Sequence, residues 1–389
     1  MLTIKIIDSH EAFNGLRYAW DELLHTSGNN GIFLTWQWLS SWLSFYQGTS
    51  RLLVVLGHDE KNALVGIAPL MIRQTRLFGV SLRSVEFIGS GPETTPDHLG
   101  FIALPAAAEE FTASVFNMLM ERSNSWDIIH LRDMDDNKPF FDRAHVFGET
   151  LKYDVVARAD QRCPFIALPG TWEEFLARLS KKWRYRVKTY ERELTEAFPV
   201  DFSIVDNPKN LDAAMEVLES LHRKRMQDKK LTGISTRILF WDFHKSIARA
   251  LLAQNQLFLG ILKIGERVIA CNYAFVYANK VSYYQSGLDP EFKNYSAGFV
   301  LNAFMIRESI QRGMAEFDFL RGDEPYKFHL TAQYRENREL FVWNSGIKGI
   351  IVSTLFRIKE RVKSLVSKGP ISPSDIPADS KPENIRERM

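Results

Sequence analysis

The chain has 389 residues, enough for two domains of ordinary size, each with its own core. Its composition, 45% hydrophobic and 25% charged, is typical of a soluble globular protein and excludes a largely disordered chain. The formal net charge of +2 gives no whole-molecule reason to expect nucleic acid, so DNA binding is not expected.

Two further features of the whole chain favour the cytoplasm. Cys163 and Cys271 lie far apart in apolar surroundings, which favours reduced, buried thiols over a disulfide framework. Residues 1–10 alternate polar and apolar positions and hold no apolar signal segment, so secretion is not expected. No window reaches the roughly 20 apolar residues of a membrane span. Any membrane contact is therefore expected to be peripheral.

The first 160 residues predict an α/β unit that begins with a short strand. Helices are expected near residues 11–26 and 35–43. In the second of these, Trp38 and Trp42 are four residues apart and share one face, which predicts a place in the core. The next expected elements are a hairpin, a strand, a helix and a strand, at 52–56 with 64–72, 85–88, 106–122 and 126–132.

The same order of elements returns in the second half. A hairpin, a strand, a helix and a strand are expected at 257–262 with 268–276, 281–287, 297–312 and 316–320. We therefore predict two related units in tandem, followed by an amphipathic helix and a disordered tail rich in Pro, Ser, Lys and Glu. The predicted divisions are 1–160, 161–346, 347–366 and 367–389.

Between the two repeats, three helices are expected, at 171–179, 182–197 and 208–226. Thr171 and Glu174 form a capping box that supports the first helix start. The segment 178–192 carries seven positive charges in fifteen residues, Arg184 among them. It suits a phosphate group of a ligand or an anionic lipid surface. The alternative is a solvated helix face balanced by nearby glutamates. The basic residues near the C-terminal helix, 357–368, permit the same membrane interpretation.

The most informative stretch is 316–327, where an apolar strand runs into a turn crowded with charge. Gly322 and Pro325 predict the turn. Ionisable groups at the end of a sheet are costly unless they pair or take part in chemistry. They predict either a catalytic corner or a salt-bridge cluster that holds the loop together. The charged groups are Asp318, Arg321, Asp323, Glu324 and Lys327, with Tyr326 between the last two.

A second candidate site lies at the start of the helix expected at 297–312. The small residues Ser296, Ala297 and Gly298, followed by Phe299, can leave backbone N–H groups free to bind an anion such as a pyrophosphate. Alternatively, Ser296 caps the helix and Gly298 permits close packing.

A third candidate is the pair Asp97 and His98, in a Gly- and Pro-rich loop of the first unit. An acceptor cleft between the two units could open there, with His98 as a base. The alternative is an ordinary turn whose side chains face solvent.

Three of these segments carry a family resemblance: 296–298, Arg312 with Gly313, and above all the string from Asp318 to Lys327. On them the chain resembles the CelD/BcsL-like bacterial acetyltransferases, a branch of the GNAT superfamily related to the FemAB peptidyltransferases. The match covers roughly residues 165–345, and a looser similarity that includes 33–38 extends over the N-terminal half. The general GNAT pyrophosphate loop has a second Gly or Ala, whereas only Gly298 stands in this loop.

The resemblance implies two GNAT-like units in tandem, each a mixed, mostly antiparallel sheet flanked by helices. It implies acetyl-CoA or another acyl-CoA as co-substrate, bound at Ser296, Ala297, Gly298 and Phe299, and no metal. Acyl transfer needs a base and a proton donor for the leaving thiolate. Glu324 is the first candidate base, before Asp318 and Asp323. Tyr326 is the candidate acid. Lys327 joins the catalytic group, and the candidate substrate contacts are Arg321, Asp97, His98 and Arg184.

The expected function is N- or O-acylation of a sugar, amino sugar or lipid-linked intermediate in cellulose, exopolysaccharide or envelope synthesis. Its expected partners are that acceptor and, at the periphery, a membrane or a polysaccharide-synthesis complex. One alternative is FemAB-like transfer of an aminoacyl group from tRNA, the only case in which tRNA is expected. A second is a non-catalytic docking protein of such a complex, which the incomplete glycine loop motivates.

Overall fold

One mixed sheet runs through the whole molecule. The computed structural model describes residues 2–151, 153–230 and 238–367. In these residues 13 strands form a sheet in the order β1-β2-β3-β4-β6-β13-β7-β12-β11-β10-β9-β8, with β5 beside β3. Among the paired strands, β4–β6 and β11–β12 are parallel and the others are antiparallel. The predicted class, a mostly antiparallel sheet flanked by helices, is confirmed.

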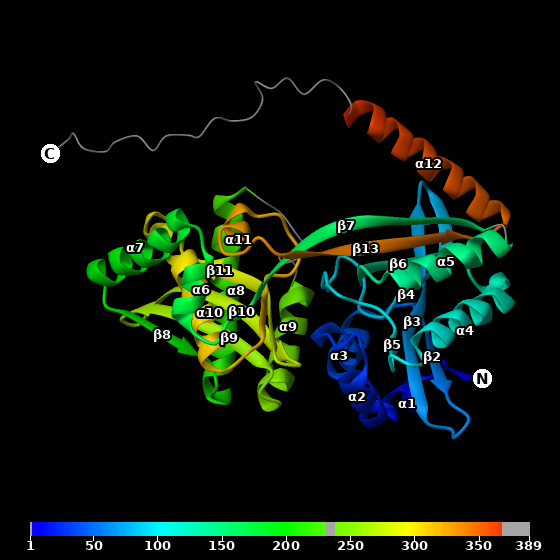
Figure 1. Cartoon of the computed structure of the whole chain (residues 1–389), viewed down its shortest axis with the longest axis horizontal. Helices are drawn as coiled ribbons and strands as arrows, with labels where there is room; N and C mark the ends of the chain where they lie inside the picture. Colours follow the sequence, from blue (N-terminus) through cyan, green and yellow to red (C-terminus); the bar gives the residue numbers. More distant parts are fainter. Residues whose placement is uncertain (1, 152, 231–237, 368–389) are drawn as a thin grey trace.

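The N-terminal half contains the first six strands and five α-helices (Figure 1). The strands are β1 (Thr3–Ile7), β2 (Arg51–His58), β3 (Leu64–Leu77), β4 (Val80–Phe87), β5 (Ile102–Ala103) and β6 (Ile128–Asp135). The helices are α1 (His10–Asn14), α2 (Arg17–Thr26), α3 (Trp36–Tyr46), α4 (Ala108–Glu121) and α5 (Lys138–Leu151). The helix expected at 11–26 is thus divided in two, because the chain breaks at Gly15 and Leu16.

The C-terminal half repeats the pattern of hairpin, strand, helix and strand. Its strands are β8 (Val200–Ile204), β9 (Leu257–Ile264), β10 (Arg267–Tyr277), β11 (Lys280–Leu288) and β12 (Glu316–Asp318). Its helices are α6 (Trp172–Arg178), α7 (Lys181–Ala197), α8 (Pro208–Asp228), α9 (Ile238–Ala253), α10 (Ala297–Gln311) and α11 (Pro325–Phe328). Thr171 caps α6 by accepting a hydrogen bond from the Glu174 amide at 3.2 Å, as the sequence predicts.

Two long strands, β7 (Asp154–Ala167) and β13 (Tyr334–Trp343), extend across the molecule and join the halves (Figure 1). β13 lies between β6 and β7, and the last residues of β7 also pair with β12. Residue 160, the predicted boundary, therefore falls inside a strand that both halves share. The division into two units at that point stays a prediction.

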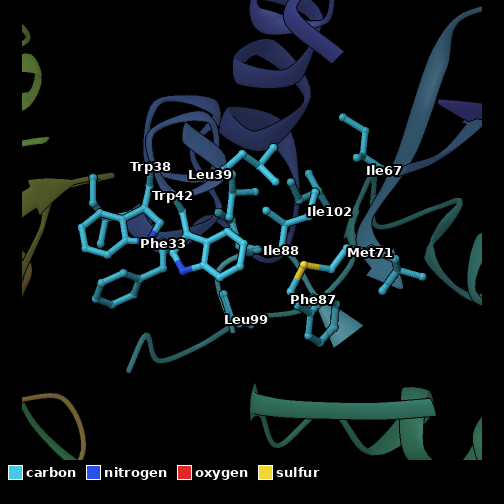
Figure 2. Close-up of a cluster of buried hydrophobic side chains, with 14 of the residues drawn as sticks. Phe33, Trp38, Leu39, Trp42, Ile67, Met71, Phe87, Ile88, Leu99 and Ile102 are labelled. Atoms are coloured by element: carbon cyan, nitrogen blue, oxygen red, sulfur yellow. The ribbon is translucent and has the colours of Figure 1, made fainter. Parts of the chain in front are cut away.

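The largest core cluster joins the helices of the N-terminal half to α9. Trp38 and Trp42 are fully buried beside Phe33 (Figure 2), so their predicted place in the core is confirmed. The Trp38 ring meets Phe243 of α9 edge-on, with ring centroids 5.3 Å apart. Cys163 and Cys271 are both buried and free, and burial raises the pKa of the Cys271 thiol to about 12. The prediction of reduced, buried thiols is confirmed.

The last described element is α12 (Ile347–Ser367), which begins at the residue where an amphipathic helix is expected. Val352 and Phe356 on its inner face pack with Phe341 and Trp343 of β13. The predicted disordered tail lies, from residue 368 onward, outside the described residues. Among the described helices, none combines the length and the apolar composition needed to cross a bilayer.

Candidate functional site

The site begins where two parallel strands separate. β11 and β12 pair only from Lys280–Glu316 to Ser282–Asp318. Beyond that point β11 continues to Leu288, whereas the segment after β12 turns away at Leu320 (φ 53°) and Gly322 (φ 121°). The left-handed conformation at Gly322 suits glycine, which has no Cβ. An opening therefore forms between the second half of β11 and the turn that follows β12.

The equivalent opening in the N-terminal half is filled. There, β4 and β6 pair only at Ser84–Ile128 and Val85–Ile129 before they diverge. The loop after β4 enters the gap, and Leu99 bridges to Met134 of β6. The Leu99 amide also donates to the Asp133 carbonyl at 2.7 Å. Of the two repeats, the second thus offers the open site.

Two adjoining pockets occupy this opening. The helix pocket, of about 240 Å³, is lined among others by Ser296, Gly298 and Phe299 at the start of α10. The corner pocket, of about 260 Å³, is lined among others by Arg321 and Glu324. Both pockets share five lining residues and so are adjoining parts of one hollow. The shared residues are Arg225, Lys229, Tyr283, Ser286 and Tyr326.

The start of α10 presents backbone donors to the helix pocket. Ser296 adopts a left-handed conformation (φ 54°), and its side chain makes no capping hydrogen bond. The Phe299 amide donates to the Ser296 carbonyl at 2.8 Å, so the N–H groups of Ala297 and Gly298 precede the first hydrogen-bonded turn. A Cβ on Gly298 would meet Leu288 only at 3.7 Å, which is ordinary contact. Close packing therefore does not explain why a glycine stands at position 298. The Ser296 side chain does not cap the helix either.

Tyr326 on α11 forms part of the wall between the two pockets. Burial, together with the neighbouring Tyr283 and Glu324, raises the pKa of the Tyr326 phenol well above its usual value. The phenol therefore stays protonated at neutral pH and can donate a proton or a hydrogen bond.

Lys327 and Glu324 differ in exposure and role. The buried Lys327 ammonium donates to the carbonyls of Arg321 at 2.6 Å and Leu320 at 3.3 Å, and lies 3.0 Å from Glu324 Oε2. It thus uses its three donors to hold the turn after β12. The Glu324 side chain is half exposed and faces the corner pocket. Asp323, beside it, is exposed to solvent. Lys327 therefore fits the loop-holding alternative, whereas Glu324 remains accessible.

Arg321 forms a buried ion cluster between the two halves. Its Nε donates to Asp97 Oδ1 at 2.8 Å and its terminal nitrogen to Asp133 Oδ1 at 2.7 Å. Burial alone would lower the pKa of Arg321, but Asp97 and Asp133 raise it. The Asn337 amide donates to the same Asp97 oxygen at 2.5 Å. Both Asp97 and Arg321 line the corner pocket, but their charges are already paired.

Asp318 and His98 face a different place. His98 lies between two carboxylates, with Nδ1 2.5 Å from Asp135 Oδ1 and Nε2 3.0 Å from Asp318 Oδ2. Asp318 also accepts from the Leu320 amide at 2.7 Å and from Arg335 at 3.1 Å. Asp318, His98 and Arg335 line a third, smaller pocket of about 70 Å³. Asp318 and Glu324, predicted as neighbouring bases, are thus in separate pockets.

Arg184 also lies outside the hollow. Its guanidinium donates to the carbonyls of Leu176 and Ala177, each at 2.8 Å, and of Leu179 at 3.2 Å. These carbonyls lie at the C-terminal end of α6, where helix carbonyls run out of intrahelical donors, and the Leu176 carbonyl also accepts from the Leu179 amide at 3.2 Å. The contacts explain Arg184 as a helix-capping residue, and we do not include it in the proposed site.

Several residues of α8 and of its C-terminal cap line the hollow without having been predicted, among them Arg225, Lys229 and His222. Arg225 donates to the Ser286 hydroxyl, and Lys229 is one turn further along the same helix face. Burial, and next the charge of Arg225, lowers the pKa of Lys229. Burial likewise lowers the pKa of His222, whose Nδ1 lies 3.0 Å from the Ser286 carbonyl. The run of basic residues at 223–225 and 229–230 was the available signal.

Comparison with known proteins relates a segment of the C-terminal half to a known family. Residues 181–328, which include the start of α10 and Tyr326, match the family described as an acetyltransferase (GNAT) domain. This part of the chain is thus similar to a GNAT-type acetyltransferase domain. No curated protein matches the chain.

Solved structures extend the likeness to most of the chain. FemX is similar with a TM-score of 0.61 and 11% identity, over 86% of this chain and 98% of that one. The C-terminal domain (DUF2156) of a candidate lysylphosphatidylglycerol synthetase from Agrobacterium fabrum is similar with a TM-score of 0.53 and 9% identity, over 88% of this chain and 95% of that one. A conserved protein of unknown function from Bacteroides thetaiotaomicron is similar with a TM-score of 0.54 and 12% identity, over 88% of this chain and 100% of that one. At these identities the likeness shows a shared fold alone.

Proposed function

We propose that this protein is an acyl-CoA-dependent N- or O-acyltransferase whose reaction takes place in the C-terminal half. The observation that carries the proposal is that the two pockets adjoin and share five lining residues. The free amides at the start of α10 and the residues Glu324 and Tyr326 open into one hollow, with Tyr283 and Tyr326 in the shared wall. Such a hollow can hold a long donor at one end and an acceptor at the other.

The helix pocket suits the phosphate-bearing part of acyl-CoA, with acetyl-CoA as the simplest donor. The first amides of α10 and the positive end of its dipole favour an anion. Arg225 and Lys229 add two positive charges to the same wall. We assign Ser296, Gly298 and Phe299 to the donor, with the buried Ala297 behind them supplying its amide.

The corner pocket suits the acceptor and the proton transfers. Glu324 accepts a proton from the acceptor amine or hydroxyl, directly or through water, while that nitrogen or oxygen attacks the thioester carbonyl. The carbon–sulfur bond then breaks, and the Tyr326 hydroxyl gives its proton to the departing thiolate. Arg321 and Lys327 hold the turn that positions both groups.

For the acceptor we propose a sugar, an amino sugar or a lipid-linked intermediate of cellulose, exopolysaccharide or envelope synthesis. The support is the resemblance to the CelD/BcsL-like family, together with hydrogen-bonding groups in the corner pocket. Gln285, Arg321 and Asp97 line it and suit hydroxyl-rich ligands.

Mass spectrometry with isotope-labelled acetyl-CoA and a panel of sugars, amino sugars and lipid-linked sugars tests this proposal. We expect one acceptor to gain a labelled acetyl group. Glu324→Gln should lower the rate by about a hundredfold, as is typical for loss of a general base. Asp323→Asn, which changes an exposed carboxylate one residue away, serves as the matched control. Absence of any labelled product, or equal loss in both variants, would count against the assignment.

A second candidate is aminoacyl transfer from charged tRNA. The fold shared with FemX and the exposed basic residues of α7 favour it; these are Lys181, Lys182, Lys188 and Arg192. Binding of aminoacyl-tRNA that weakens steeply with salt, together with indifference to acetyl-CoA, would select this candidate over the first.

A further inference from the structure

The helix α12 is apolar on two opposite faces. Its inner face packs on β13 through Val352 and Phe356. Its outer face carries six large apolar residues that are 37% to 80% exposed. We call them the outer stripe: Ile347, Ile350, Ile351, Leu355, Ile358 and Val362.

The outer stripe is continuous. At 100° per residue, its members lie within an arc of about 140° on the side of the helix that faces away from Val352 and Phe356. Single exposed apolar residues are common on protein surfaces, but a contiguous row of this kind marks an interaction site. Phe78, in the turn between β3 and β4, is also exposed and lies close to α12, because the Lys359 ammonium is 5.8 Å from its ring centre.

Positive charge borders the stripe on both edges. By the same geometry, Lys348 and Lys359 lie along one edge and Arg361 along the other, next to Arg357, which pairs with Asp154 of β7. The only acidic residue in Ile347–Ser367 is Glu360, which is turned toward the body of the protein and pairs with Arg158 at 3.2 Å. Long basic side chains beside an apolar face reach the headgroups of a bilayer while the apolar residues enter its boundary.

We propose that the outer stripe of α12 docks onto an anionic membrane surface. The isoleucines enter the boundary between headgroups and acyl chains, and the basic edges meet lipid phosphates. The proposal does not rest on the proposed acyltransferase activity, because vesicle binding is measured without any substrate.

Two other occupants fit less well. A second copy of the chain, paired through the same face, would bring two sets of positively charged edges close to one another, which is unfavourable. The tail, residues 368–389, holds three isoleucines set among four prolines and many charged residues, a sparse complement to six apolar side chains.

Co-sedimentation of the full chain with vesicles tests the proposal. One set is phosphatidylcholine alone, and the other contains about 30% phosphatidylglycerol to mimic an anionic leaflet. The test variant is Ile351→Asp with Ile358→Asp. The matched control is Tyr18→Asp with Val146→Asp, which changes two exposed apolar residues elsewhere. Circular dichroism checks that both variants melt like the native chain.

The native chain should bind the anionic vesicles and bind neutral vesicles more weakly. The stripe variant should lose at least about tenfold in affinity, and the control should not. Absence of vesicle binding, or equal binding by the stripe variant, would overturn the proposal. A dimer that the stripe variant abolishes, without vesicle binding, would assign the face to a second copy. Vesicle binding that appears only after deletion of residues 368–389 would show that the tail covers the outer stripe in the full chain.

Discussion

The Tyr326 hydroxyl combines a shifted pKa with a place in the wall that both pockets share. If it protonates the departing thiolate, Tyr326→Phe should lower kcat by about a hundredfold or more. The loss should shrink with an acyl donor whose thiol is more acidic, because that thiolate leaves without a proton. Rates with acetyl-CoA and with an acetyl aryl thioester check this. Tyr185→Phe, at an exposed tyrosine of α7, is the control. Equal losses with both donors would contradict the acid role.

His98 provides a pH-dependent test of the contact between the halves. Burial alone would lower the pKa of His98, but Asp135 and Asp318 hold it well above 6.5. Because the folded pKa exceeds the unfolded one, the stabilisation is complete below about pH 6.5 and is lost as pH rises through the folded value. His98→Gln should therefore lower the free energy of unfolding by about 3 kcal/mol near pH 6 and by less toward pH 10.

Urea unfolding of the native chain and of His98→Gln at pH 6, 8 and 10 measures that difference. His58→Gln, at a histidine in the N-terminal sheet, is the control. A difference that stays constant or grows with pH would rule out a charged His98 between the two carboxylates.

Single residues of the site were predictable only where the signal was local. The small residues before α10 and the charged turn after β12 were recognisable because neighbours in sequence define them. The partners of Asp318 and Arg321 were not, because His98, Asp97 and Asp133 come from the other half of the chain. Residues distant in the sequence therefore decide whether a carboxylate is accessible in a pocket or is held in an ion pair.

At the scale of elements, the hollow depends on the close approach of α8 to β11. A Cβ on Gly287 would lie 2.6 Å from Leu221 Cβ and 3.0 Å from the His222 backbone nitrogen. Gly287→Ala must therefore push α8 away, and we expect it to cost about 3 kcal/mol of unfolding free energy. It should also weaken acetyl-CoA binding, because Arg225 and Lys229 move with α8.

Gly298→Ala is the matched control for that substitution, since its Cβ would meet Leu288 at an ordinary 3.7 Å. Urea unfolding of both variants gives the comparison. Equal stabilities would show that α8 does not depend on contact at Gly287.

The repeated order of hairpin, strand, helix and strand was predictable from apolar periodicity and turn residues, whereas α5, α9 and β7 were missed. In α9 the polar residues Asp242, Lys245 and Arg249 lie on one face and the buried apolar residues on the other, so its periodicity was a signal that the prediction did not use. In β7, the exposed polar residues 160–162 resemble a linker. They are part of a strand because β13 pairs with Gln161 and Arg162 and again with Ala159, with Asp160 at the register shift between them.

On the scale of the whole molecule, the halves share strands and a buried ion cluster, so they should unfold together. A chain that begins at residue 161 would lose Val155, Val156 and Ala157, the partners of Leu340–Val342 in β13. We expect that chain to aggregate or remain unfolded, and the full chain to show one cooperative transition. Near-ultraviolet circular dichroism during urea titration is the measurement. A folded, monomeric chain starting at 161 would contradict this view.

The central claim is that the start of α10 binds the donor at the end of the hollow opposite Glu324. Isothermal titration of acetyl-CoA tests it most directly, with the native chain, Gly298→Trp and the exposed control Gly170→Trp, whose Cβ would meet only Glu174 Oε2 at 4.0 Å. We predict binding by the native chain and by Gly170→Trp, and a loss of at least about tenfold in Gly298→Trp, because the indole would fill the helix pocket. No heat with the native chain, or unchanged affinity in Gly298→Trp, would contradict the claim.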